Sequence, residues 1–175
     1  MVCRLSRLVG SFALAWLCAT AVAQTREPEQ YFFQPFLGDF HSELDAAHSE
    51  NKRGILVIYE MEECPFCDRF HKTVLREAAV QDFFRRYFLV FRVDIKGGNR
   101  VTGFDGKELS EKAFAAGHGV RATPTTVFYD LAGKEMTRYT GPARDAREFL
   151  LLGQYVLDEA YRNQPFSQYK RSTGR

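Results

Sequence analysis

Residues 55–70, ILVIYEMEECPFCDRF, place a strand, a Cys-x-x-Cys pair and the start of a helix in direct succession. The run ILVIYE is continuously apolar and rich in β-branched residues, which is typical of a strand covered on both faces. From Pro65 onward apolar residues recur at helical spacing, with Cys67 and Phe70 on one face. Proline suits the first position of a helix, because its missing N–H would have no partner there. The pattern therefore predicts Cys64 at a helix N-terminus.

The order of the remaining elements predicts the fold class. In sequence order the patterns predict a helix at 40–51 with Asp39 as N-cap, the strand 55–60, the helix from Pro65, a helical piece at 77–86, a strand at 88–94, a Gly-rich loop at 95–108, a short helix at 110–117, a hairpin with strands 125–130 and 135–139, and a closing helix at 146–160. A parallel β-α-β half followed by a β-β-α half indicates an α/β fold: a central mixed sheet between two helical layers.

The first 23 residues have the pattern of a secretory signal. Arg4 and Arg7 precede an apolar run over 8–22, and Ala21-Val22-Ala23 forms a small-x-small cleavage site. The run is short of the roughly 20 apolar residues that a bilayer span needs. We expect cleavage after Ala23 and a periplasmic location. Cys3 and Cys18 would leave with this signal.

The rest of the chain fits one domain. We expect an N-terminal lead-in at 24–37, a domain at 38–162 and a frayed C-terminal tail at 163–175. Without residues 1–23, Lys+Arg falls from 24 to 22, equal to the 22 Asp+Glu. A neutral chain argues against a nucleic-acid or anionic-membrane partner, which would usually require a basic cluster. No phosphate-binding motif stands in the right context, so no nucleotide is expected.

The Cys64–Cys67 pair fits three kinds of chemistry: redox exchange, metal binding or a structural staple. A staple across so small a loop adds little stability. A closed zinc site needs four ligands, and Cys64, Cys67 and His71 supply three. Covalent haem attachment requires histidine directly after the second cysteine, where Asp68 stands. Redox exchange is the favoured interpretation, with no metal and no cofactor.

The joint order of several motifs resembles the thioredoxin-fold family, and most closely its exported SoxW-type and related thioredoxin-like members. The strand ILVIYE and Cys-Pro-Phe-Cys are followed at a distance by Thr123-Pro124-Thr125 before VFYD, by Gly133 and by Gly141. The resemblance spans about residues 38–160 and covers nearly the whole expected domain.

The resemblance implies a role for each matching residue. Cys64 would be the exposed nucleophile and Cys67 the resolving cysteine. Pro124 would be the cis proline packed on the disulfide, with Thr123 offering backbone hydrogen bonds to a bound substrate chain. Pro65 and Phe66, between the cysteines, would contact that substrate, and an exposed Phe66 would give it an apolar contact.

Two departures from the family pattern affect the site. Ile58 stands where the best-known thioredoxins have a buried aspartate, so proton transfer to and from Cys67 by that group is in doubt. Glu60 and His71 are the nearest titratable substitutes. Glu63 stands where those thioredoxins have tryptophan.

The charges around Cys64 predict a modestly lowered thiol pKa. The helix N-terminus offers unpaired N–H groups and about half a positive charge. Glu62 and Glu63 oppose the thiolate, each by about 1 kcal/mol or less in solvent. We expect the pKa of Cys64 to stay above about 5, and the couple to be less oxidising than one with a strongly stabilised thiolate.

These observations lead to a functional hypothesis with two alternatives. We expect a thiol-disulfide oxidoreductase that reduces protein disulfides and is itself re-reduced by a membrane electron-donor protein, as the resemblance implies. The alternatives are a disulfide-forming oxidase of the same fold and a non-enzymatic binding or chaperone module.

Overall fold

The computed structural model describes residues 24–173 of the 175-residue chain. The predicted secretory signal at 1–23 lies outside the described residues. The elements in chain order are α1 (Pro28–Tyr31), α2 (Phe40–Ser49), β1 (Gly54–Glu60), α3 (Pro65–Phe70), the π-helical segment η1 (His71–Leu75), α4 (Ala78–Tyr87), β2 (Phe88–Asp94), β3 (Arg100–Thr102), β4 (Glu108–Ser110), α5 (Glu111–Gly117), β5 (Thr125–Tyr129), β6 (Glu135–Thr140), α6 (Ala146–Leu157), the 3-10 turn η2 (Ala160–Arg162) and α7 (Phe166–Thr173).

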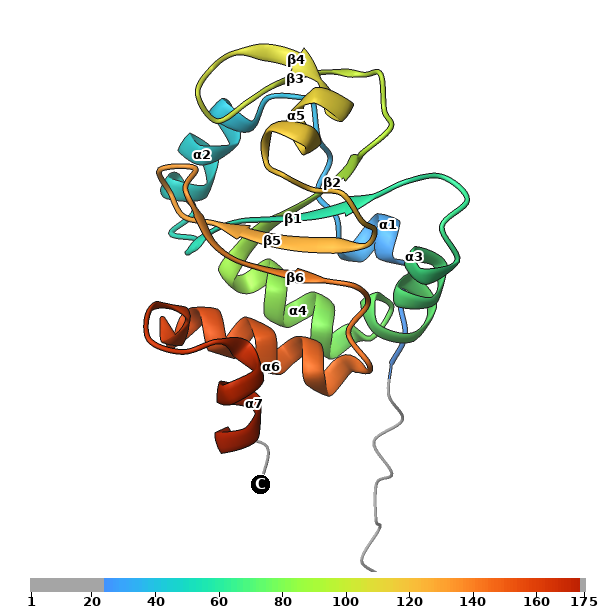
Figure 1. The fold of residues 1–175 in the computed structure, drawn as a ribbon, viewed down its shortest axis with the longest axis vertical. Coiled ribbons are helices and arrows are strands. Elements are labelled where there is room, and N and C mark those ends of the chain that lie inside the picture. Colours follow the sequence, from blue (N-terminus) through green and yellow to red (C-terminus); the bar gives the residue numbers. More distant parts are fainter. Residues whose placement is uncertain (1–23, 174–175) are drawn as a thin grey trace, which may run out of the picture.

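A four-stranded mixed sheet forms the middle layer, with the strand order β2-β1-β5-β6. β1 and β2 are parallel, whereas β5 is antiparallel to both β1 and β6. Helices α2 and α5 cover one face of this sheet, and α4 and α6 cover the other (Figure 1). The predicted α/β class, with a β-α-β half joined to a β-β-α half, is confirmed.

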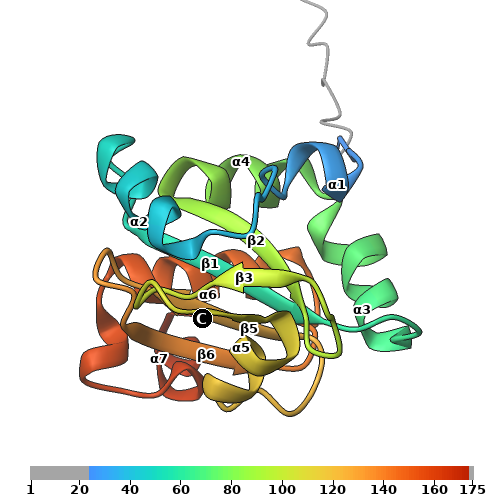
Figure 2. The same cartoon turned by 90° about the horizontal axis from the view of Figure 1, so that it is seen from above.

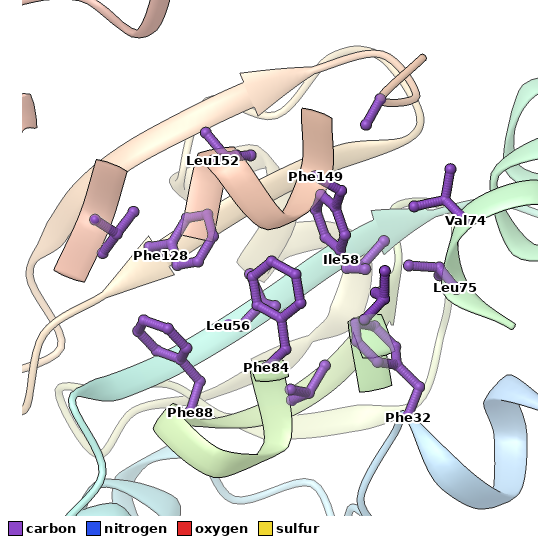
Figure 3. Packing of buried hydrophobic residues seen from close by; sticks show 14 of the residues in the cluster. Phe32, Leu56, Ile58, Val74, Leu75, Phe84, Phe88, Phe128, Phe149 and Leu152 are labelled. Carbon is purple, nitrogen blue, oxygen red and sulfur yellow. The ribbon is translucent and has the colours of Figure 1, made fainter. Parts of the chain in front are cut away.

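Aromatic side chains fill the core on both faces of the sheet. On the α4 and α6 face, the rings of Phe84 and Phe149 lie 4.3 Å apart, and Ile58 of β1 packs in the same cluster (Figure 3). On the α2 and α5 face, the rings of Phe40 and Phe114 stack 4.6 Å apart. Burying each such side chain contributes about 1.5–3 kcal/mol, so both helical layers are held mainly by apolar contact.

The lead-in segment before α2 covers the outer edge of β2. The Gln34 amide donates to the Val90 carbonyl at 2.9 Å, and the Val90 amide donates to Oε1 of Gln34 at 2.6 Å. Phe32 and Phe33 are buried against the domain. These contacts give the edge strand the partners that an uncovered edge would lack.

Two expectations about the less regular parts of the chain are wrong. The expected loop at 95–108 contains strand β3 and the first residue of β4, and these two short strands pair antiparallel. The expected frayed tail at 163–175 instead forms α7, which packs on α6 through Tyr169, only 6% exposed. Chain ends fray unless they are tied down, and here an aromatic anchor ties the end down. None of the described helices is long and apolar enough to cross a membrane.

Candidate active site

The register of β1 against β5 brings the two halves of the site together. Tyr59, near the end of β1, pairs with Thr125 at the start of β5. The turn that leads to Cys64 and the segment that leads into β5 therefore meet at one end of the sheet. Figure 2 shows α3 at this end, beyond the point where β1 finishes.

Cys64 is the N-cap residue of α3. Glu63 before it has a left-handed backbone (φ 54°), which turns the chain out of the strand. Sγ of Cys64 accepts a hydrogen bond from the amide of Cys67 at 3.1 Å, and Pro65 begins the helix. The prediction that Cys64 lies at a helix N-terminus is confirmed, and its sulfur receives one of the amides that a helix start leaves unpaired.

Cys64 and Cys67 form a disulfide, with their Cα atoms 5.2 Å apart. Both cysteines are 4% exposed. The resemblance implied that Cys64 is the exposed member, but in the disulfide form Cys64 is as buried as Cys67. The two cysteines differ in their contacts: Sγ of Cys64 lies near the Cys67 amide and the Thr123 hydroxyl, whereas Cys67 is, with Phe70, one of the two buried residues of α3.

The segment before β5 supplies the other side of the site. The Thr123–Pro124 peptide bond is cis, as the resemblance implies, and Pro124 is buried. The Pro124 carbonyl accepts the Gly141 amide at 2.8 Å, which ties this segment to the end of β6. Oγ1 of Thr123 lies 3.3 Å from Sγ of Cys64. The resemblance implied a backbone role for Thr123, and the sequence gave no signal for this side-chain contact.

The surface around the cysteines is apolar at one point and acidic beside it. Phe66 is 61% exposed, as expected for a residue between the two cysteines, and Pro65 is exposed as well. Glu62 and Glu63 are both exposed in the preceding turn. A partner chain that approaches Cys64 would meet both kinds of surface. The substrate contacts of Pro65 and Phe66 stay predictions.

Glu60 and His71 form a partly buried pair close to the cysteines. Nε2 of His71 lies 2.8 and 3.0 Å from the two carboxylate oxygens of Glu60. The side chain of His71 is 20% exposed and that of Glu60 is 14% exposed. Burial opposes the charged form of His71, but the hydrogen bond and the negative charge of Glu60 outweigh it and raise the pKa of His71. The sequence identified both residues but not their pairing.

A groove of about 1260 Å³ runs beside this pair, along the lead-in segment and the edge of β2. Glu60, Met61 and Glu62 of the turn before Cys64 line one of its sides. Within residues 24–173, no group of three or more His, Cys, Asp or Glu side chains is arranged to hold a metal ion.

A family model described as Thioredoxin-like domain matches residues 40–157. The chain belongs to the thioredoxin-like domain family. This match covers about two thirds of the chain and includes the cysteines, Thr123, Pro124 and Gly141. The chain therefore has the thioredoxin-like fold of thiol-disulfide oxidoreductases, and the Cys64–Cys67 pair lies within the matched residues.

Solved thioredoxin-fold structures superpose on the chain. A thioredoxin-fold protein from Helicobacter pylori is 21% identical, with a TM-score of 0.58, and the match covers 70% of this chain and 84% of that one. A thioredoxin from Thermus thermophilus is 25% identical, with a TM-score of 0.53 and coverage of 68% and 84%. A candidate disulphide-isomerase from Bacteroides thetaiotaomicron is 26% identical, with a TM-score of 0.55 and coverage of 76% and 94%. The comparison with curated proteins found no match.

Proposed function

We propose that the chain is an exported thiol-disulfide oxidoreductase that reduces protein disulfides through a Cys64/Cys67 dithiol. The observation that carries this proposal is the position of Cys64 Sγ. It lies between the Cys67 amide, 3.1 Å away, and the Thr123 hydroxyl, 3.3 Å away. Two hydrogen-bond donors aimed at one sulfur favour its thiolate, which is the nucleophile of disulfide exchange.

The reaction proceeds through a mixed disulfide. In the reduced enzyme, the Cys64 thiolate attacks one sulfur of a substrate disulfide; the Cys64–substrate bond forms, the substrate S–S bond breaks, and the released thiolate takes a proton. The Cys67 thiol then loses its proton and attacks Sγ of Cys64. The Cys64–Cys67 disulfide forms and the second substrate thiolate leaves. Two electrons pass from the enzyme to the substrate.

The surroundings of Cys64 suit a polypeptide substrate. Phe66 offers an exposed apolar contact beside the sulfur, and Thr123 and Pro124 form the opposite side of the approach. The structural likeness to a candidate disulphide-isomerase, at 26% identity, agrees with a protein substrate. We place the protein in the periplasm on the pattern of residues 1–23, and among the SoxW-type proteins on the sequence resemblance.

A reductase in an oxidising compartment must be re-reduced after each turnover. The dithiol that attacks the Cys64–Cys67 disulfide would belong to a membrane electron-donor protein. Its electrons return the pair to the thiol state, and its own dithiol becomes a disulfide.

Trapping tests the proposal. In the Cys67→Ser variant the resolving step is blocked, so substrates should accumulate as mixed disulfides on Cys64 in a periplasmic extract. The Cys64→Ser variant is the matched control and should trap none. A reduction potential near about −270 mV would agree with a reductase, whereas one near about −120 mV would indicate a disulfide-forming oxidase. Failure of Cys67→Ser to trap any protein would favour a binding or chaperone module and overturn the proposal.

A further inference from the structure

The resolving step of the proposed function requires a negatively charged Cys67 thiolate. Cys67 must lose a proton before it can attack Cys64, yet it is 4% exposed. Burial in apolar surroundings disfavours a thiolate. Ile58 of β1, which belongs to the same apolar cluster as Phe70 of this helix, is fully buried and carries no charge. The groups that favour the Cys67 thiolate therefore lie elsewhere.

His71 lies one helical turn from Cys67. Its amide donates to the carbonyl of Cys67, four residues earlier. Residues at this spacing are neighbours on a helix surface, with Cβ atoms about 5–6 Å apart. His71 is also the first residue of the π-helical segment η1, whose widened turn is closed by the hydrogen bond from the Arg76 amide to the His71 carbonyl at 3.1 Å. Single π turns inside helices occur frequently at functional sites.

Glu60 holds His71 from the neighbouring strand. Both of its carboxylate oxygens lie within 3.0 Å of Nε2 of His71. The pair is mostly buried, and Glu60 also lines the groove of about 1260 Å³, so it has access to water from one side. The positive member of the pair thus begins the π-helical segment that continues the helix of Cys67, and the negative member ends strand β1.

The other charged groups that face His71 form a pair of their own. Glu29 of α1 and Arg92 of β2 are joined by an ion pair of 2.6 Å, and they act on His71 in opposite directions. Glu60 is therefore the partner that decides the charge of His71. Protonated His71 carries a positive charge one helical turn from Cys67 along the chain, and a nearby positive charge favours a thiolate.

We propose that the Glu60–His71 pair is a positioning pair that promotes deprotonation of Cys67 in the resolving step, an inference that rests on the proposed function. Glu60 keeps His71 positively charged, and the imidazolium stabilises the Cys67 thiolate across one turn of helix. The proton of Cys67 passes to solvent, the thiolate attacks Sγ of Cys64, and the substrate thiolate leaves. The pair thus provides a charged group near Cys67, whereas the buried Ile58 of β1 provides none.

A small chromogenic disulfide, 5,5′-dithiobis(2-nitrobenzoate), separates the two chemical steps. Attack by Cys64 on a limiting amount releases one coloured thiolate, and resolution by Cys67 releases the second. The full chain with Cys3→Ser and Cys18→Ser restricts the reaction to the active pair. At about pH 7.5, one unit above the ordinary pKa of histidine, Glu60→Gln and His71→Gln should each slow the second release by about tenfold, the effect of one unit in the Cys67 pKa. The first release should keep its rate.

The pH profile distinguishes this role from a structural one. Near about pH 5.5 the His71 of Glu60→Gln regains its proton without a partner, so the second release should recover relative to the wild type, while His71→Gln should stay slow. His71→Lys keeps a positive charge and should restore the second step. His48→Gln, at an exposed site on α2, is the matched control and should change neither step.

The outcomes separate the two proposals. Equal slowing of both steps at every pH, or an unchanged second step in both variants, would overturn the role of the pair and leave the proposed function intact. Release of only one coloured thiolate by the otherwise wild-type pair would mean that Cys67 does not resolve, and the proposed function itself would fail. Urea unfolding of each variant checks that it is folded.

Discussion

The hydroxyl of Thr123 lies 3.3 Å from Sγ of Cys64, although 59 residues separate them in the chain. A thiolate can only accept a hydrogen bond, so in the reduced protein the hydroxyl is the donor. A hydrogen bond to the charged form of a group favours that form. The Thr123 hydroxyl therefore lies where it can stabilise the Cys64 thiolate.

Replacing Thr123 by valine should raise the pKa of Cys64. Valine keeps the shape of threonine but removes the donor, and a hydrogen bond to a charged group is worth about 1.5 kcal/mol, or about one pKa unit. The ultraviolet absorbance of the thiolate against pH measures the change, and Thr123→Ser should restore the wild-type value. Thr126→Val is the matched control, since this buried hydroxyl of β5 has no hydrogen-bond partner among the described residues. An unchanged Cys64 pKa in Thr123→Val would contradict the assignment.

The acidic turn before Cys64 should act in the opposite direction. Glu62 and Glu63 are exposed, so replacing each with glutamine should lower the pKa of Cys64 by about half a unit, as expected for a solvent-screened charge. The double variant should also be the stronger oxidant at equilibrium with glutathione, because its reduced form is stabilised. Asp45→Asn, on the exposed side of α2, should have no effect. A rise in the pKa of the double variant would show that these charges do not oppose the thiolate.

The pair of Glu60 and His71 makes stability depend on pH near neutrality. The folded-state pKa of His71 is raised above the unfolded value, so its stabilisation is complete below about pH 6.5 and is lost as the pH rises through the raised pKa. Between about pH 5.5 and 6.5, where imidazole is protonated and carboxylates are ionised, wild type should exceed Glu60→Gln in free energy of unfolding by about 1.5–3 kcal/mol, the worth of a hydrogen bond to a charged group. The difference should shrink as the pH rises through the raised pKa of His71. Burial lowers the pKa of His118, so His118 makes the free energy of unfolding rise with pH. This contribution cancels in the difference between wild type and Glu60→Gln, because both proteins contain His118. Urea unfolding at several pH values gives the difference, and a difference independent of pH would rule out the charged pair.

The regular elements around the cysteines could be predicted from the sequence because their signals are local. The continuous apolar run of β1, the proline at the start of α3 and the turn between β5 and β6 each encode their own geometry. Asp39 was predicted as the N-cap of α2, and its side chain accepts the amide of Ser42 at 3.0 Å. Where local propensity and tertiary packing agree, the sequence pattern is sufficient.

The contacts that complete the site could not be predicted, because each depends on where distant segments meet. The Thr123 hydroxyl reaches Cys64 only through the register of β5 against β1, and a single sequence does not show that register. Glu60 and His71 are 11 residues apart, and their pairing depends on how α3 turns back onto the sheet. The spacing of four residues between Cys67 and His71 is a local signal that His71 lies near the cysteines, but it does not indicate Glu60 as the partner of His71.

Tyr169 should account for a measurable part of the stability, because it holds the C-terminal helix that the sequence pattern missed. Its ring lies 5.2 Å from that of Tyr155 in α6, and its hydroxyl donates to Oδ2 of Asp158 at 2.5 Å. Tyr169→Ala removes a buried aromatic ring and should cost about 3 kcal/mol, whereas Tyr169→Phe loses only the hydrogen bond and should cost about 1 kcal/mol. Urea unfolding measures both, and Tyr31→Ala, at a 45% exposed tyrosine of α1, is the matched control with an expected change below about 0.5 kcal/mol. If Tyr169→Ala were no more costly than Tyr31→Ala, the end of the chain would be frayed in solution, as its sequence alone predicts.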